Sequence, residues 1–227
     1  YNLGSIASKL LAPFARRFIA GVTLAEALQC CAKLKAAGLT TTLDHLGEAV
    51  MSAAEAEVAT EEYIVMLKAL KERNLDRNVS LKLTQFGLDI DPELCVKNLT
   101  RVVNAAEELH GFVRVDMEGS SETDGTLKAV KIARRSRVSP VGAVLQAMLH
   151  RTPDDMLELI KREVPIRLCK GAYKEPPAIA LQKMEDVQKQ FLALAKRLLT
   201  TGHHHAVATH DRKLIDNIKN FAAEQGI

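Results

Sequence analysis

The chain has 227 residues and a formal net charge of +3, and it is 47% hydrophobic, 26% charged and 4% aromatic, without tryptophan. This length and apolar content predict one large domain with a substantial core. The near-balanced charge and the scarcity of aromatic rings disfavour a nucleic-acid-binding surface, which needs basic patches and rings on which bases stack.

No uninterrupted apolar run approaches the ~20 residues that span a bilayer. Residues 5–18 place apolar side chains at helical spacing, with Lys9, Arg16 and Arg17 among them. No long apolar segment follows these basic residues, as it would in a secretory signal. We therefore expect an amphipathic helix at this end and a cytoplasmic protein, and we leave open a peripheral contact with a membrane.

The next part of the chain contains two helix starts with clear capping residues. Thr23 is followed three residues later by Glu26, which is typical of a capping box and predicts a helix over residues 23–38. Asp91 and Pro92 predict the N-cap and the first turn of a later helix.

Thr152 and Pro153 predict a similar start further along the chain, and helical and strand patterns alternate throughout. After the first two helices, we expect helices at residues 49–70, 92–109, 123–135, 153–163, 177–199 and 211–224. We expect strands at residues 39–43, 79–83, 111–118, 141–148, from 166 to before the glycine at 171, and at 205–209.

This alternation of strand and helix predicts parallel β/α units. No GxGxxG sequence occurs, so a Rossmann nucleotide-binding domain has no support. We predict a (β/α)8 barrel of the TIM type, distorted and represented by about six of its eight units. In this interpretation residues 1–38 form N-terminal helices, and residues 39–227 form the barrel.

Polar residues gather near the carboxyl ends of the predicted strands, where the active sites of such barrels lie. Random polarity would not favour one end of six apolar strands. We therefore predict a site for a ligand with anionic and hydrogen-bonding parts. Its candidate residues are Asp44, Lys82, Asp116, Gln146, Arg167, Lys170, Thr209 and His210.

Each candidate also has a structural alternative. Asp44 can simply end a strand, Lys82 can extend into solvent, and Asp116 can supply negative charge before the next helix. Gln146 lies in an otherwise apolar strand, where a buried amide needs partners. Arg167 either lines a site for an anionic group or extends its charge into water.

The cysteines and histidines do not form a recognisable metal motif. Four cysteines lie within apolar patterns without CxxC spacing, so we expect reduced, buried thiols at Cys30, Cys31, Cys95 and Cys169. Three consecutive histidines occupy residues 203–205, but adjacent strand residues point to opposite faces, so all three cannot bind one ion. We expect no metal, and we keep a metal-dependent barrel hydrolase as an alternative.

Six segments at the predicted strand ends share a recognisable order. They read TTLDHLGE from Thr41, VSLKL from Val79, VRVDME from Val113, VLQA from Val144, RLCKGAY from Arg167 and ATHD from Ala208. Together they extend from residue 41 to residue 211, and two predicted helices precede them. In order and approximate spacing they resemble the strand-end motifs of proline dehydrogenase, the flavin-dependent proline oxidase.

The resemblance implies a distorted (β/α)8 barrel that holds FAD at its mouth and oxidises L-proline to 1-pyrroline-5-carboxylate, with a membrane quinone as electron acceptor. It implies that Lys82 binds the substrate beside Asp44, that Asp116 and Arg167 form the catalytic pair, and that Tyr173 lines the proline pocket. The implied FAD contacts are Met117, Gln146, Lys170, Gly171, Ala172, Thr209 and His210.

These roles agree with simple chemistry. A fixed cation such as Arg167 stabilises the negative charge that hydride transfer leaves on a flavin, and Gly171 allows close approach of the backbone. Lys82 suits a small carboxylate, and Gln146 can donate to and accept from a ring edge.

The family also carries paired arginines, which clamp the proline carboxylate, on its last barrel helix, and no segment of this chain aligns with that helix. We therefore expect the chain to be a fragment, with a non-catalytic truncated barrel as an alternative.

Overall fold

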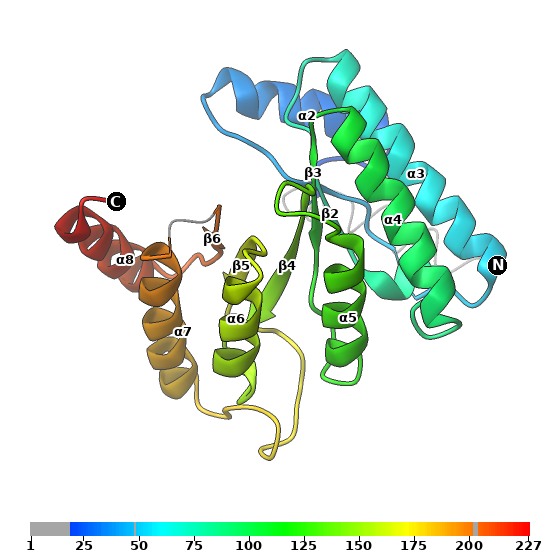
Figure 1. The fold of residues 1–227 in the computed structure, drawn as a ribbon. Helices are drawn as coiled ribbons and strands as arrows, with labels where there is room; N and C mark the ends of the chain where they lie inside the picture. The colour runs from blue at the N-terminus through cyan, green and yellow to red at the C-terminus, as the bar shows by residue number, and fades with distance from the viewer. Residues whose placement is uncertain (1–18, 48, 202–203) are drawn as a thin grey trace, which may run out of the picture.

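The computed structural model describes residues 19–47, 49–201 and 204–227, which form one six-stranded parallel sheet with strand order β1-β2-β3-β4-β5-β6. Each strand pairs with its neighbour in sequence, and the sheet curls into an open half-barrel with helices around its outer face (Figure 1). The predicted succession of six β/α units is confirmed. The helix expected at residues 5–18 lies outside the described residues, and the domain boundary at residue 38 stays a prediction.

The strands are short, and the helices that follow them are longer. The strands are β1 (Leu43–Asp44), β2 (Asn78–Leu81), β3 (Phe112–Val115), β4 (Val141–Gln146), β5 (Ile166–Cys169) and β6 (Ala206–Val207). The helices are α2 (Leu24–Ala36), α3 (Ala53–Glu72), the 3-10 helix η1 (Leu83–Phe86), α4 (Pro92–Glu108), α5 (Thr123–Ala133), α6 (Thr152–Lys161), α7 (Met184–Leu199) and α8 (Arg212–Gln225).

Capping side chains begin the helices much as the sequence predicts. At α2, the Thr23 hydroxyl accepts a hydrogen bond from the backbone N–H of Glu26 at 3.3 Å. At α4, Asp91 caps the helix and Pro92 occupies its first turn. The structure places the start of α3 at Ala53 rather than at residue 49, because Ser52 accepts from the Glu55 backbone N–H and ends the preceding loop.

Most predicted strands and several predicted helices are shorter in the structure. In place of the strand expected at 39–43 the structure has the two-residue β1, and the strand expected at 205–209 is reduced to β6. The strands expected at 79–83, 111–118 and 141–148 end at Leu81, Val115 and Gln146. The helix at 177–199 begins only at Met184. The preceding residues form a turn that places Ala180 in an antiparallel bridge with Leu149, and helical backbone cannot make such a bridge.

The prediction that Thr152 is an N-cap is wrong. Its hydroxyl donates to the Gln146 carbonyl at 2.5 Å, so α6 includes it and Arg151 takes the capping position without a side-chain bond.

The thiols also differ in part from expectation, because Cys31 and Cys95 are buried whereas Cys30 and Cys169 are partly exposed. No helix among the described residues is long and apolar enough to cross a membrane.

The two faces of the sheet differ sharply in polarity. The register pairs Val79 with Val113 and Leu81 with Val115, so these side chains share the outer face, where the helices cover them. The alternate residues therefore share the inner face of the half-barrel. That face carries Asp44, Ser80, Lys82, Arg114, Asp116, Gly142, Val144, Gln146, Arg167 and Cys169.

Below the carboxyl ends, the inner face holds a buried guanidinium. Arg114 is 5% exposed, donates to the Pro165 carbonyl at 2.9 Å and lies 4.7 Å from the centre of the Phe112 ring. Burial and the nearby positive charge of Arg167 lower the pKa of Arg114 to about 10. Gly142, paired with Arg114 on β4, leaves room for this side chain, because a Cβ there would lie 2.7 Å from its Nη1.

We expect Gly142→Ala to destabilise the fold. The added Cβ would lie 2.4 Å from the Pro165 carbonyl oxygen, and backbone cannot move aside as a flexible side chain can. The free energy of unfolding, measured by urea denaturation with circular dichroism, should fall by about 1–3 kcal/mol. Gly119→Ala is the control, since its Cβ meets mainly the flexible Glu122 carboxylate. Equal stability of the two variants would contradict the proposed crowding.

Candidate functional site

The ends of β1 and β2 hold a paired carboxylate and ammonium. Lys82 Nζ lies 3.3 Å from Asp44 Oδ2. Tyr63 of α3 is fully buried, and its hydroxyl lies 3.0 Å from Asp44 Oδ1 and 2.9 Å from the Ser80 carbonyl oxygen. A phenol has one proton, so it donates to one of these acceptors at a time. The buried tyrosine thus holds the carboxylate that Lys82 faces.

The charges around Lys82 favour its ammonium form. Burial is the largest single influence and lowers the pKa of Lys82. The negative charge of Asp44, its hydrogen bond to Lys82 and the charges of Asp116 and Glu118 together outweigh burial and raise that pKa above its usual value. Burial and the charge of Asp44 also raise the pKa of Tyr63 far above its usual range, so the phenol keeps its proton. At neutral pH the inner face therefore presents a fixed ammonium, which suits an anionic ligand.

A second cluster joins β2, β3 and β5 across the inner face. Asp116 Oδ1 accepts hydrogen bonds from Nη2 of Arg167 and, at 2.8 Å, from the Ser80 hydroxyl. Arg167 Nη2 also donates to that hydroxyl at 2.8 Å. The side chains of Asp116 and Arg167 are 20% and 23% exposed, so they are partly shielded but reachable from the barrel mouth. The predicted catalytic pair is therefore in direct contact.

Gln146 at the end of β4 keeps one polar atom without a partner. Its Nε2 donates to the carbonyl oxygens of Met117 and Glu118, at 3.3 Å and 2.6 Å. Its Oε1 is buried and has no hydrogen-bond partner among the described residues. Gly171 lies against it with φ +104, and a Cβ at Gly171 would meet Gln146 Oε1 at 2.8 Å and Met148 at 2.6 Å. An unpaired buried acceptor beside a glycine is suited to a ligand that carries an N–H donor.

A buried glutamate closes the site beside η1. The Glu118 carboxylate accepts from the Thr84 backbone N–H at 3.1 Å and from the Thr84 hydroxyl at 2.7 Å. Burial raises the pKa of Glu118, although both hydrogen bonds oppose this change. Burial and the negative charge of Glu118 also raise the pKa of Tyr173, whose side chain is 43% exposed. Tyr173 therefore lies within electrostatic range of the site while remaining open to solvent.

Lys170 forms a separate contact with the start of α8. Its Nζ lies 2.9 Å from Asp211 Oδ2, and Asp211 also caps α8 and accepts from Gln188 at 2.7 Å. The Thr209 hydroxyl accepts from the Asp211 backbone N–H at 3.1 Å, so Thr209 belongs to this group. His210 is exposed beside it, and Ala172 is exposed on the loop after β5.

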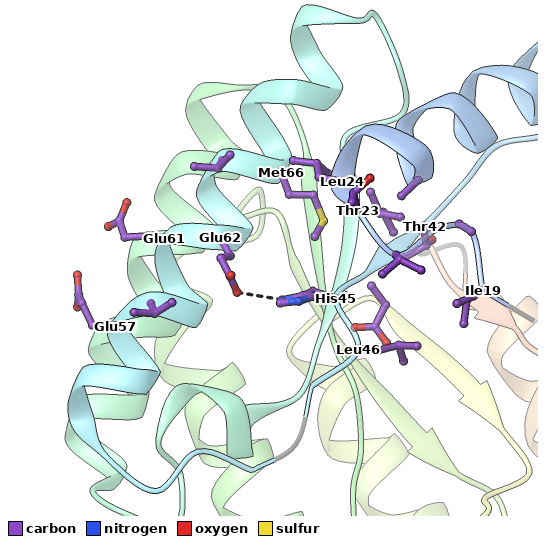
Figure 2. A pocket seen from close by; sticks show the side chains of 18 residues that line it. Ile19, Thr23, Leu24, Thr42, His45, Leu46, Glu57, Glu61, Glu62 and Met66 are labelled. Carbon is purple, nitrogen blue, oxygen red and sulfur yellow. Dashed lines mark ion pairs between the residues drawn. The ribbon is translucent and has the colours of Figure 1, made fainter. Parts of the chain in front are cut away.

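A cavity of about 1000 Å³ lies beside the site rather than within it. Figure 2 shows the side chains that line it. It is enclosed by the segment that leads into α2, by the loop after β1 and by α3, and it shares Asp44 with the site. The ion pair between His45 Nδ1 and Glu62 Oε2, at 3.1 Å, lines the cavity (Figure 2). Lys82 and Arg167 are absent from its lining.

Among the described residues, no group of three or more histidine, cysteine, aspartate or glutamate side chains is placed to hold a metal ion.

Sequence reasoning did not assign Ser80, Tyr63 or Asp211 to the site, although the side chain of each contacts a predicted site residue. A signal for Ser80 was available, because it precedes Lys82 by two residues and a strand places both on one face. Tyr63 comes from a helix on the other side of the sheet, and Asp211 resembles an ordinary N-cap. Neither has a local pattern that links it to the site.

Comparison with known proteins identifies close relatives. The family model described as "Proline dehydrogenase" matches residues 27–227. Proline dehydrogenase 2 of Bacillus subtilis is 38% identical over 213 residues, and the proline dehydrogenase of Deinococcus radiodurans is 33% identical over 217 residues. Each alignment covers 94% of this chain and 70% of the relative.

Solved structures show the same fold. Proline utilization A from Bdellovibrio bacteriovorus, inactivated by N-propargylglycine, superposes with a TM-score of 0.87 at 24% identity. That match covers 99% of this chain and 28% of the other. A mutant of the Bradyrhizobium japonicum protein gives a TM-score of 0.72 at 18% identity, over 89% of this chain and 24% of the other. The chain thus spans about a quarter of these longer proteins, and the matches support its assignment to the barrel fold.

We expect Asp44→Asn to lower the pKa of Lys82, because burial then acts without the charge that opposes it. A lower pKa leaves more neutral amine at a given pH, so acetic anhydride at pH 8 should acetylate Lys82 faster in the variant, as measured by peptide mass spectrometry. Asp216→Asn on the exposed helix α8 is the matched control and should leave the rate of Lys82 acetylation at its wild-type value. Equal rates in both variants would show that Asp44 does not set this pKa.

Proposed function

We propose that this chain, which belongs to the proline dehydrogenase family, oxidises L-proline to 1-pyrroline-5-carboxylate with FAD as the hydride acceptor and a quinone as the final electron acceptor. The observation that carries the proposal is the inner face of the half-barrel, which Lys82 and the Arg167–Asp116 pair share with an unpaired buried acceptor on Gln146. Lys82 can bind the carboxylate of a small zwitterion, and Gln146 Oε1 can accept a hydrogen bond from an N–H group of a flat ring.

The residues around Gln146 fit a flavin. A flavin ring edge carries N–H and C=O groups, and Gln146 Oε1 is a buried acceptor that lacks a donor among the described residues. Gly171 leaves space in front of it that a Cβ would fill. We assign Met117, Lys170, Ala172, Thr209 and His210 to the rest of the cofactor site, from the resemblance of their motifs to the family pattern.

Bound FAD would supply a two-electron acceptor for the hydride that leaves the proline ring. Arg167 would place a fixed positive charge beside the cofactor and stabilise the negative charge gained on reduction. Asp116 would hold that guanidinium in one orientation through their direct contact. Both side chains are at least three-quarters shielded from solvent, which strengthens the electrostatic effect of the arginine.

Lys82 would bind the proline carboxylate. Its raised pKa keeps the ammonium charged, and because an ammonium has three N–H donors, its hydrogen bond to Asp44 leaves donors for a second carboxylate. The exposed ring of Tyr173 would cover the apolar ring of the substrate. A lysine acts here as a point charge, so it gives affinity with little demand on orientation.

A visible spectrum followed by anaerobic titration with L-proline tests the proposal. The purified protein should show flavin absorbance, and proline should bleach it as the cofactor is reduced. A flavin spectrum that proline does not change would instead favour a non-catalytic barrel. A colourless protein that does not bind added FAD would overturn the cofactor assignment.

We expect Lys82→Met to raise the dissociation constant of proline at least tenfold, since a charged hydrogen bond contributes roughly 1.5–3 kcal/mol. Lys131→Met is the control, because Lys131 makes its 3.0 Å ion pair with Glu158 on the outer helices. Both constants come from the dependence of flavin bleaching on proline concentration. An unchanged constant in Lys82→Met would remove Lys82 from the substrate site.

We expect Arg167→Met to slow the limiting rate of flavin reduction on the order of 100-fold, a loss typical of removing one fixed group that stabilises developing charge. Stopped-flow absorbance at saturating proline measures this rate. Arg137→Met is the matched control, because its guanidinium pairs with Glu163 on the exposed surface. A rate equal to that of the control would contradict the role assigned to Arg167.

A further inference from the structure

The Ser80 hydroxyl stands between the two charged partners of the predicted catalytic pair. It accepts a hydrogen bond from Arg167 Nη2 at 2.8 Å and donates one to Asp116 Oδ1 at 2.8 Å. Arg167 Nη2 also donates directly to the same oxygen of Asp116. The three groups therefore close a triangle of hydrogen bonds, in which only a group that both donates and accepts can occupy the third corner.

We propose that Ser80 is a positioning residue that fixes the orientation of the Arg167 guanidinium toward the reacting centre. The proposal rests on the function proposed above and adds to it a residue that touches neither proline nor cofactor. Ser80 is 3% exposed, so it acts through Arg167 and Asp116 rather than by contact with a ligand.

The backbone of Ser80 is a rigid anchor for its hydroxyl. Ser80 lies in β2, between two parallel partners, and its Cα is in register with Asp44 on one side and Arg114 on the other. Its carbonyl oxygen lies 2.9 Å from the buried Tyr63 hydroxyl. Sites built on central strands hold side chains more precisely than sites built on loops.

A guanidinium held only by Asp116 can rotate about that single contact. Both hydrogen bonds to Asp116 fall on Oδ1, so the carboxylate does not grip Arg167 in the two-pronged way that fixes its plane. The Ser80 hydroxyl supplies a second acceptor for the same Nη2 and thereby restricts the rotation. Its removal should disturb the step that depends on Arg167 and spare substrate binding by Lys82.

The test compares Ser80→Ala, Ser80→Thr and the control Ser139→Ala. Ser139 is also a buried serine whose hydroxyl bonds to Ser136, but it lies in the connection before β4, away from the site. Stopped-flow reduction of the flavin by proline gives a limiting rate and a dissociation constant for each variant. Thermal melting then confirms that each variant is folded.

We expect Ser80→Ala to lower the limiting rate about tenfold, as expected for the loss of a hydrogen bond to a charged group, while the proline dissociation constant stays within about twofold. Ser80→Thr keeps the hydroxyl and should restore the rate to within about threefold of the wild type. Ser139→Ala should match the wild type in both constants. A Ser80→Ala rate equal to that of Ser139→Ala would overturn the proposal, and so would an equal loss in rate and affinity.

A second readout does not depend on turnover. Nitrogen-15 NMR of arginine side chains detects the guanidinium of Arg167, assigned with Arg167→Lys, and shows whether rotation about its bonds is slow. The wild-type signals should be resolved, and Ser80→Ala should broaden or shift them whereas Ser139→Ala should not. Unchanged Arg167 signals in Ser80→Ala would overturn the proposal.

The two readouts also separate failure of the function from failure of the inference. A wild-type protein that proline does not reduce would overturn the proposed function, and the NMR comparison would then decide whether Ser80 orients Arg167. A wild-type protein that proline does reduce, with Ser80→Ala unchanged in rate and in NMR signals, would overturn the inference and leave the proposed function standing.

Discussion

Side chains alternate between the two faces of the curled parallel sheet, and this alternation decides which residues pack under the helices and which line the half-barrel. Valine and leucine alternate with polar residues along β2 and β3, so the outer face packs under the helices and the inner face is left with charges. A shift of one residue in β2 would turn Ser80 and Lys82 toward the helices and Val79 and Leu81 toward the inner face. The same register therefore builds the core and places the functional side chains.

The charges of the inner face are arranged so that few lack partners. Lys82 faces Asp44, Arg167 faces Asp116, and the buried Arg114 relies on backbone carbonyls and an aromatic ring. Within the described residues, Arg114 makes no ion pair at contact distance. Counted with the buried Glu118, these residues are three cations and three carboxylates, so the inner face presents fixed charges of both signs at the mouth of the half-barrel. Such an arrangement costs stability and is typical of a binding site rather than of a structural core.

Much of this organisation could be predicted from the sequence, because hydrophobic periodicity and strong capping residues are local signals. The order of strands and helices was correct, and the structure brings the predicted Asp116 and Arg167 into direct contact. Boundaries were less accurate where tertiary contacts decide, as at the turn around Ala180, which pairs with Leu149. Tyr63 could not be found, because its contact with Asp44 joins a helix to a strand end across the sheet and leaves no local pattern.

The N-cap of α8 joins this helix to the loop after β5 and to α7. Asp211 uses Oδ1 for the first turn of the helix and Oδ2 for Lys170 and Gln188, which belong to the loop after β5 and to α7. One carboxylate therefore connects three segments. If α8 moved away from the half-barrel, the ion pair between Asp211 and Lys170 would break, and the Lys170 ammonium would become available to another anion.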